Sequence, residues 1–196
     1  TCGPCANFNT NYYSPFYTTG NNQNSMAFIS YQVNWPGTGD PYYTAEVGTR
    51  VGYYGVSGAP TLFIDAKDNT NFNTAQLQTG LNNALLVPAY FGLTATKELV
   101  GDQMTVNVTT MPYLTGTYKM HVVVVEKLTT GNIATNGETS FKHVMMKMIP
   151  DANGTTVNFT HDVQTTNNFQ ATLTGLNIEE MDDLDVVVFI QNNSNK

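Results

Sequence analysis

Seven short apolar segments follow Pro88, and they restrict what this 196-residue chain can fold into more than any other feature. Each is bounded by Gly, Asn or Pro, the residues that favour turns. The predicted strands are residues 93–100, 104–110, 118–126, 141–148, 155–159, 169–173 and 184–191. A series of this kind predicts an antiparallel β-sandwich in the second half of the chain.

The first half alternates between strand-like and helix-like segments. Residues 26–33 and 61–65 are compact apolar runs that predict buried strands. Asp40 precedes a proline in the manner of a helix N-cap, so we expect a helix over residues 41–54. The leucine spacing over residues 74–86 predicts a second amphipathic helix.

Together these patterns predict two domains. Residues 1–88 should form an α/β domain, because strands and helices alternate there. Residues 89–196 should form a sandwich of the immunoglobulin-like kind. Residues 6–25 are rich in Asn, Tyr and Thr and contain a proline, so a helix near the N-terminus is expected to be short or irregular.

The charge balance argues against two classes of partner. The formal net charge is −7, and eight Lys and Arg residues are scattered along the chain, so we expect no binding to nucleic acid or to anionic membrane surfaces. No apolar run is long enough to span a bilayer. Membrane association is therefore expected only through an anchor or partner outside this sequence, and any export signal is expected to lie upstream.

The two cysteines of the sequence lie in the tetrapeptide Cys2-Gly3-Pro4-Cys5. This spacing can close a small disulfide, and at a helix start it stabilises a thiolate, which indicates redox chemistry. Half of a zinc site is the first alternative, but no second cysteine pair completes it and the three histidines all lie beyond residue 120. A purely structural disulfide is the second, although so short a loop constrains little of the unfolded chain.

Pro60 lies 55 residues after Cys5, in a loop that enters the second predicted strand. If the bond between Ala59 and Pro60 is cis, the turn would present the Ala59 backbone beside the sulfur atoms. An extended substrate chain could pair with it there. Cis bonds are uncommon even before proline, so this expectation depends on the cysteine motif as well as on the loop.

At this point residues 1–87 resemble the thioredoxin superfamily, in which a Cys-X-X-Cys motif at a helix start faces a cis-proline loop. The resemblance implies that Cys2 is the attacking thiol, Cys5 the resolving thiol and Pro60 the cis-proline. It implies substrate contacts at Ala59, Gly3 and Pro4. It also implies a strand and an aromatic residue before the first cysteine; only Thr1 stands there, so we expect the sequence to be part of a longer chain.

The whole sequence also resembles the twenty-eight-kilodalton outer-membrane protein family of Bacteroidetes. The resemblance rests on Asp40-Pro41, residues 50–54, residues 54–61, Phe141-Lys142-His143-Val144, Pro150, Gly154 and residues 188–192. It implies export across the inner membrane and a location in the periplasm, at the outer membrane or at the cell surface.

These resemblances imply a thiol-disulfide oxidoreductase of the bacterial cell envelope that acts on protein thiols or disulfides. They imply neither a metal nor an organic cofactor. The alternative is a non-catalytic structural or binding protein, in which the thioredoxin-like half is a scaffold and the sandwich contacts an envelope partner.

Two further clusters are expected to be structural. Met145, Met146 and Met148 lie in one predicted strand, where we expect them to pack into the core on one face. The acidic residues of segment 179–185 lack the regular oxygen spacing of a calcium loop. A solvated turn is the expectation there.

Overall fold

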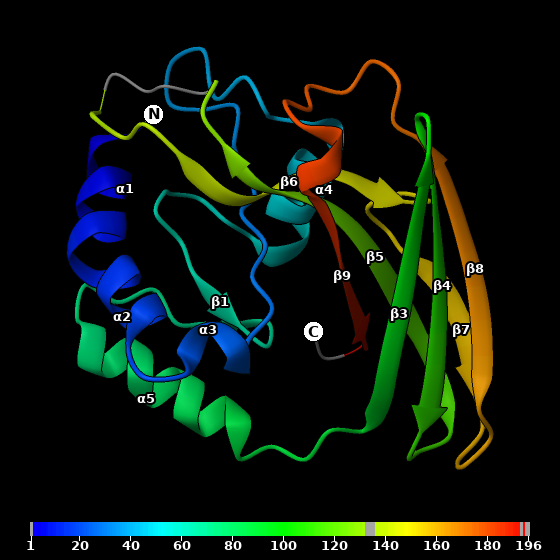
Figure 1. The fold of residues 1–196 in the computed structure, drawn as a ribbon. Helices are drawn as coiled ribbons and strands as arrows, with labels where there is room; N and C mark the ends of the chain where they lie inside the picture. The colour runs from blue at the N-terminus through cyan, green and yellow to red at the C-terminus, as the bar shows by residue number, and fades with distance from the viewer. Residues whose placement is uncertain (1, 132–135, 193, 195–196) are drawn as a thin grey trace.

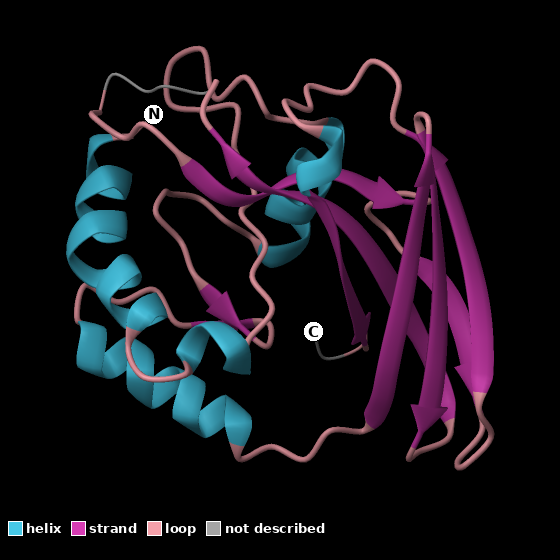
Figure 2. Cartoon of the chain, viewed as in Figure 1, coloured by secondary structure: helices cyan, strands magenta, loops and turns pink. Residues whose placement is uncertain are grey.

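The computed structural model describes residues 2–131, 136–192 and 194. Helices occupy much of the chain up to Leu85, and antiparallel strands dominate from Phe91 onward (Figures 1 and 2). The protein is therefore mostly β with a few helices. All seven strands expected in the second half are present, with boundaries that differ from the prediction by a few residues at most.

The first sheet has three strands in the order β3-β4-β8. Their bounds are Phe91–Val100 for β3, Gln103–Pro112 for β4 and Thr165–Thr172 for β8. Strands β3 and β4 form a hairpin whose turn includes Gly101 at φ 62°, a conformation that glycine adopts without a steric cost. Along β4, buried and more exposed residues alternate, as expected for a sheet with one face in a core.

The second sheet is built around the long strand β5, Gly116–Thr129. Strands β6 (Phe141–Ile149) and β7 (Thr155–Phe159) pair with successive stretches of one edge of β5, and β9 (Leu184–Gln191) pairs with the other. Residues from His121 to Glu126 are almost fully buried without alternation. Such a run is typical of a strand that is covered on both faces.

The two faces of β5 belong to different cores. Val122 and Val124 pack with residues of the first sheet, such as Val106, whereas Val123 and Val125 pack against Val47 of helix α4. The second sheet therefore lies between the first sheet and the helical part of the chain (Figure 1).

The methionines of β6 follow the same division, which corrects the prediction that they share one face. Met146 lies in the core between the sheets, and Met145 and Met148 lie on the helical side. The register of β5 with β6 shifts between Val124 and Val125, and this irregularity breaks simple alternation.

The N-terminal helices form one continuous but irregular helical run. An α-helical turn, α1 (Gly3–Phe8), passes into a π-helical segment, η1 (Asn9–Tyr13), and then into α2 (Ser14–Thr18). Helix α3 (Asn22–Ser25) follows after a turn. The expected irregularity is present, yet the run is longer than the Asn-rich sequence indicated.

Helix α4, Ala45–Tyr54, begins four residues later than predicted. Asp40 caps a preceding turn instead, since its carboxylate accepts a hydrogen bond from Tyr42 N at 3.0 Å, and Thr44 is the N-cap. The helix ends at Gly55, whose φ of 68° is the left-handed conformation common at helix C-termini.

Helix α5, Thr74–Leu85, lies where the sequence predicted a helix. The Asn73 side chain caps it by accepting hydrogen bonds from Ala75 N and Gln76 N. Its buried residues Leu77 and Leu81 pack with Phe8 and Phe16 in a third core cluster.

Among the described residues of the first half, the sheet has two strands, fewer than the α/β layer predicted from the sequence would contain. Strands β1 (Phe63–Ile64) and β2 (Lys67–Asp68) are a minimal antiparallel hairpin. Residues 26–33 are extended but make only an isolated parallel bridge, between Ser30 and Val144 of β6. Apolar composition predicted an extended chain here, but a ladder also needs a neighbouring strand in register.

The acidic segment that includes η2 (Met181–Asp183) is hydrogen-bonded to the second sheet rather than fully solvated, since Leu128 N of β5 donates to Asp183 Oδ2 at 2.8 Å. Glu179 accepts hydrogen bonds from Tyr42, Thr130 and Gly131. Burial opposes ionisation of Glu179, but these bonds outweigh it and lower its pKa to about 2. The described residues contain no group of three or more His, Cys, Asp or Glu side chains placed to hold a metal ion.

Candidate functional site

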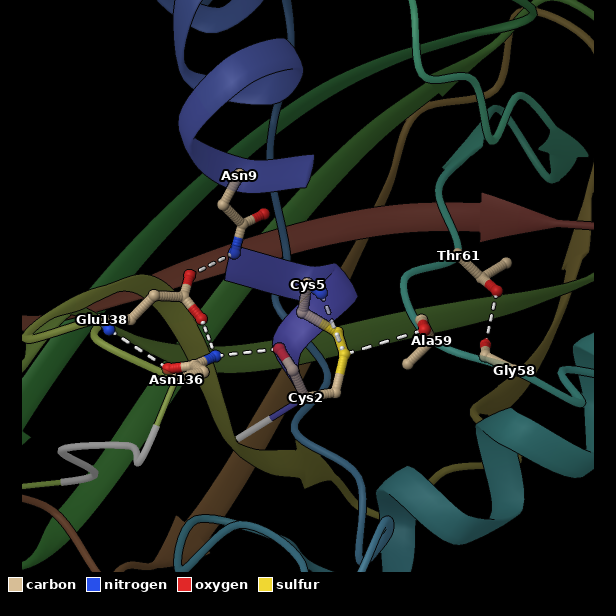
Figure 3. The surroundings of a disulfide bond; sticks show 8 residues. All are labelled: Cys2, Cys5, Asn9, Gly58, Ala59, Thr61, Asn136 and Glu138. Carbon is tan, nitrogen blue, oxygen red and sulfur yellow. Dashed lines mark hydrogen bonds between the residues drawn. A yellow bond between two sulfur atoms is a disulfide. The ribbon is translucent and has the colours of Figure 1, made fainter. Parts of the chain in front are cut away.

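Cys2 and Cys5 form a disulfide at the start of α1 (Figure 3). Their Cα atoms are 5.2 Å apart. Cys2 is the N-cap of the helix, and its sulfur accepts a hydrogen bond from Cys5 N at 3.0 Å. The backbone thus already directs a donor at Cys2 Sγ, and such a donor favours a thiolate over a thiol after reduction.

The loop between α4 and β1 lies beside this disulfide. The Ala59-Pro60 peptide bond is cis. The carbonyl oxygen of Ala59 lies 3.7 Å from Cys2 Sγ, although the two residues are 57 positions apart (Figure 3). A disulfide has no thiol hydrogen, so this is a packing contact in the oxidised form; reduced Cys2 could donate its proton to the carbonyl.

The six residues singled out from the sequence do not all share one environment. Cys2, Cys5, Ala59 and Pro60 line one cavity. Gly3 and Pro4 are exposed and do not line it. Cys2 is only 7% exposed, whereas Cys5 is half-buried.

The cavity has a volume of about 750 Å³. Its walls come from the extended segment 25–33, from the loop and hairpin over residues 58–66, and from residues 187–192, which are the end of β9 and the residue that follows it. Most of these side chains are apolar. Two of the lining segments, 25–33 and 58–66, contain the residues that were predicted to be strands in the first half.

Arg50, the only arginine of the sequence, also lines this cavity. It is 3% exposed and donates hydrogen bonds to Tyr54 Oη at 2.9 Å and Gln191 Oε1 at 3.0 Å. Its guanidinium lies 4.6 Å from the ring centre of Tyr53. Burial raises the pKa of neighbouring Tyr31 to about 12, although Arg50 acts in the opposite direction.

Sequence reasoning missed Arg50, although its being the only arginine was a visible signal. It also missed Asn136 and Glu138, which lie in the segment between β5 and β6 and contact the cysteine helix (Figure 3). Nothing in their local sequence indicates this contact, because it joins positions more than 120 residues apart.

A comparison with known protein families matches residues 49–196 to the family described as outer membrane protein Omp28. The match includes Pro60 and most of the segments on which the predicted resemblance rests, but not Cys2, Cys5 or Asp40. No curated protein matches the chain.

The family description agrees with the predicted location outside the cytoplasm, at the outer membrane or cell surface. Among the described helices, none is both long and apolar enough to cross a membrane. Because the family match spans about three quarters of the sequence, the chain belongs to the Omp28 outer membrane protein family.

Proposed function

We propose that the chain is a thiol-disulfide oxidoreductase of the cell envelope and that Cys2 and Cys5 are its redox pair. The observation that carries this proposal is the Cys2–Cys5 disulfide at a helix start, in contact with the Ala59 carbonyl. An envelope location exposes the chain to proteins that contain disulfides, so protein thiols or disulfides are the proposed partners.

The chemistry needs only the two sulfur atoms. In the reducing direction, the Cys2 thiolate attacks a substrate disulfide, forms a mixed disulfide and releases one substrate thiolate. The Cys5 thiolate then attacks Cys2 Sγ, which releases the second substrate thiolate and forms the Cys2–Cys5 bond. Two electrons pass from the protein dithiol to the substrate, and solvent protonates the products. The oxidising direction is the reverse.

We further propose a thioredoxin-like domain over residues 1–88 and an immunoglobulin-like domain over residues 89–196. Two features support the first domain: the Cys2–Cys5 pair lies at a helix start, and the cis-Pro60 loop lies beside it. Segment 26–33 and strand β1 of the hairpin both line the 750 Å³ cavity.

A non-catalytic scaffold is the second candidate, and one specific observation favours it. Cys2, the proposed attacking residue, is only 7% exposed, whereas reactive cysteines are usually partly accessible. On this reading, the disulfide fastens the start of the N-terminal helix, and the strand-rich half binds an envelope partner.

Reduction of insulin disulfides by the purified chain, with dithiothreitol as electron donor, separates the two candidates. The oxidoreductase should accelerate insulin precipitation, and Cys2→Ser and Cys5→Ser should each abolish the acceleration. Asn11→Ser, at an exposed position of the same helical run, is the control that should retain it. Activity that survives Cys2→Ser would eliminate the proposed nucleophile, and an inactive wild type would favour the scaffold.

A further inference from the structure

A short segment from the strand-rich half reaches the cysteine helix. The Asn136 side chain donates a hydrogen bond from Nδ2 to the Cys2 carbonyl oxygen at 2.9 Å, and the same nitrogen lies 2.6 Å from Glu138 Oε2. Asn9 Nδ2 donates to the other carboxylate oxygen, Glu138 Oε1, at 2.6 Å. Glu138 N closes the cluster by donating to Asn136 Oδ1 at 3.1 Å.

The cluster of Asn136, Glu138 and Asn9 is hydrogen-bonded to the start of the helical run that carries the disulfide. In a helix, residues four and seven positions apart lie on the same side. Asn9 is four positions after Cys5 and seven after Cys2. Glu138 is therefore connected to the N-terminal helical run at two points. It accepts a hydrogen bond from Asn9 directly, and it contacts the Cys2 carbonyl through Asn136 (Figure 3).

Glu138 also brings a negative charge to this position. The charged residues that line the cavity shared with the disulfide are Asp40, Arg50, Asp65 and Glu138. Of these four, Glu138 is the one that is hydrogen-bonded to Asn136, whose side chain donates to the Cys2 carbonyl oxygen. Within the described parts of the chain, its carboxylate forms no ion pair with a lysine, arginine or histidine.

We propose that Asn136 and Glu138 are positioning residues of the redox pair, supplied by the segment between β5 and β6, and that the Glu138 charge makes the pair more reducing. The inference rests on the thiol-disulfide chemistry proposed above. It adds a specific role for the strand-rich half: this half fixes the backbone of Cys2 and sets the electrostatic environment of the thiolate.

The direction of the effect follows from charge. Reduction converts a neutral disulfide into a pair that carries a thiolate at neutral pH whenever one thiol pKa is low. A nearby carboxylate destabilises that thiolate and raises the thiol pKa. The reduced form is destabilised relative to the disulfide, so the pair gives up electrons more readily.

Glu138→Gln tests the charge while it conserves the shape and one acceptor oxygen. We expect the equilibrium with a glutathione redox buffer to shift towards the protein dithiol by about three- to tenfold, where tenfold corresponds to about 30 mV. The pH profile of cysteine alkylation by iodoacetamide should shift to lower pH. Glu98→Gln, the same change at an exposed position of β3, is the control and should leave both measurements unchanged.

Asn136→Ala tests the positioning. We expect faster hydrogen exchange at the Cys5 and Ala6 amides, which donate to the Cys2 carbonyl, with no change at the amides of β5. Glu138→Asp keeps the negative charge on a shorter side chain. Its equilibrium with the glutathione buffer should therefore lie closer to that of the wild type than to that of Glu138→Gln.

These measurements do not depend on catalysis, so they fail separately from the proposed function. A wild type that does not reduce insulin, but whose equilibrium shifts in Glu138→Gln, removes the oxidoreductase and keeps the positioning role. A catalytically active wild type, with Glu138→Gln and Glu98→Gln both within twofold of it, overturns the role of Glu138.

Discussion

The two halves of the molecule bury their apolar residues to different degrees. In the strand-rich half, Val122 and Val124 of β5 have no exposed surface and lie in a core closed by two sheets. In the helix-rich half, Ile29 and Val33 remain partly exposed along a cavity of about 750 Å³. Two packed antiparallel sheets enclose a core, whereas the helices around a minimal hairpin leave a cavity that the Cys2–Cys5 disulfide lines.

The two halves contact each other at the face of the second sheet that is turned away from the first sheet. Helix α4 packs Val47 against Val123 and Val125, and Lys147 of β6 forms an ion pair with Glu46 at 2.6 Å. Burial opposes ionisation of Glu46, but the hydrogen bond and charge of Lys147, together with hydrogen bonds from the Glu46 backbone and Thr44, outweigh it and lower the Glu46 pKa. The strand-rich half is thus the platform on which the helices are ordered.

The largest test of this comparison uses one buried phenylalanine from each half. Phe159 of β7 is 2% exposed and packs 4.9 Å from Phe91, centroid to centroid; Phe16 of α2 is 1% exposed. We expect Phe159→Ala to lower the free energy of unfolding by about 3–5 kcal/mol. Phe16→Ala should lower the free energy of unfolding by about 3 kcal/mol, the lower end of this range, because Phe16 already borders the cavity and has fewer packing contacts to lose.

Urea denaturation measures the two losses, and hydrogen exchange locates them. Phe159→Ala should accelerate exchange in the strands and in helix α4, because α4 packs on the second sheet. Phe16→Ala should accelerate it only before residue 86. Equal acceleration in β5 for both variants would show that the halves are a single cooperative unit.

The strand-rich half was predictable because its information is local. Alternating apolar residues and turn residues set β4 and β7, and each strand then needed only an antiparallel neighbour close in space. The helix-rich half was less predictable because its elements depend on distant partners. Residues 26–33 have the composition of a strand, but among the described residues they pair only at Ser30, with Val144 of β6. A turn uses the Asp40 cap that the sequence assigned to α4.

The candidate site divides in the same way. The proximity of the cysteine pair to Ala59 and Pro60 was expected from a resemblance, which carries long-range information that composition lacks. Asn136, Glu138 and Arg50 were not expected, because their roles come from contacts between the halves. Single polar residues in irregular segments show no periodicity from which such contacts could be inferred.

A second test concerns acid stability, which should originate in the strand-rich half. His121 of β5 is 1% exposed, stacks on Phe189 at 4.7 Å and has no hydrogen-bond partner for either ring nitrogen among the described residues. Burial, assisted by the positive charge of Arg50, lowers its pKa to about 4. The unfolded chain therefore takes up a proton at higher pH than the folded chain does.

Stability should fall as the pH decreases from about 6.5 to about 4, by about 2–3 kcal/mol in total from His121. Burial also lowers the pKa of His143, which adds a smaller loss of the same sign. Urea denaturation at several pH values should show a flatter profile for His121→Gln than for His161→Gln, a control at an exposed position. Parallel profiles would remove His121 as the source.

The smallest test addresses whether the helix-rich half can lose stability alone. Asn73 caps α5 by accepting hydrogen bonds from Ala75 N at 2.9 Å and Gln76 N at 3.3 Å. Asn73→Ala should cost about 1 kcal/mol, because Ala75 N loses its side-chain acceptor and Gln76 N keeps only the Asn73 backbone carbonyl. Since α5 packs on the N-terminal helical run and not on the second sheet, exchange should accelerate in α5 while the amides of β5 stay protected. Asn73→Asp retains an acceptor and should restore the wild-type value; acceleration that reached β5 would instead mean that the helices stabilise the platform as much as it stabilises them.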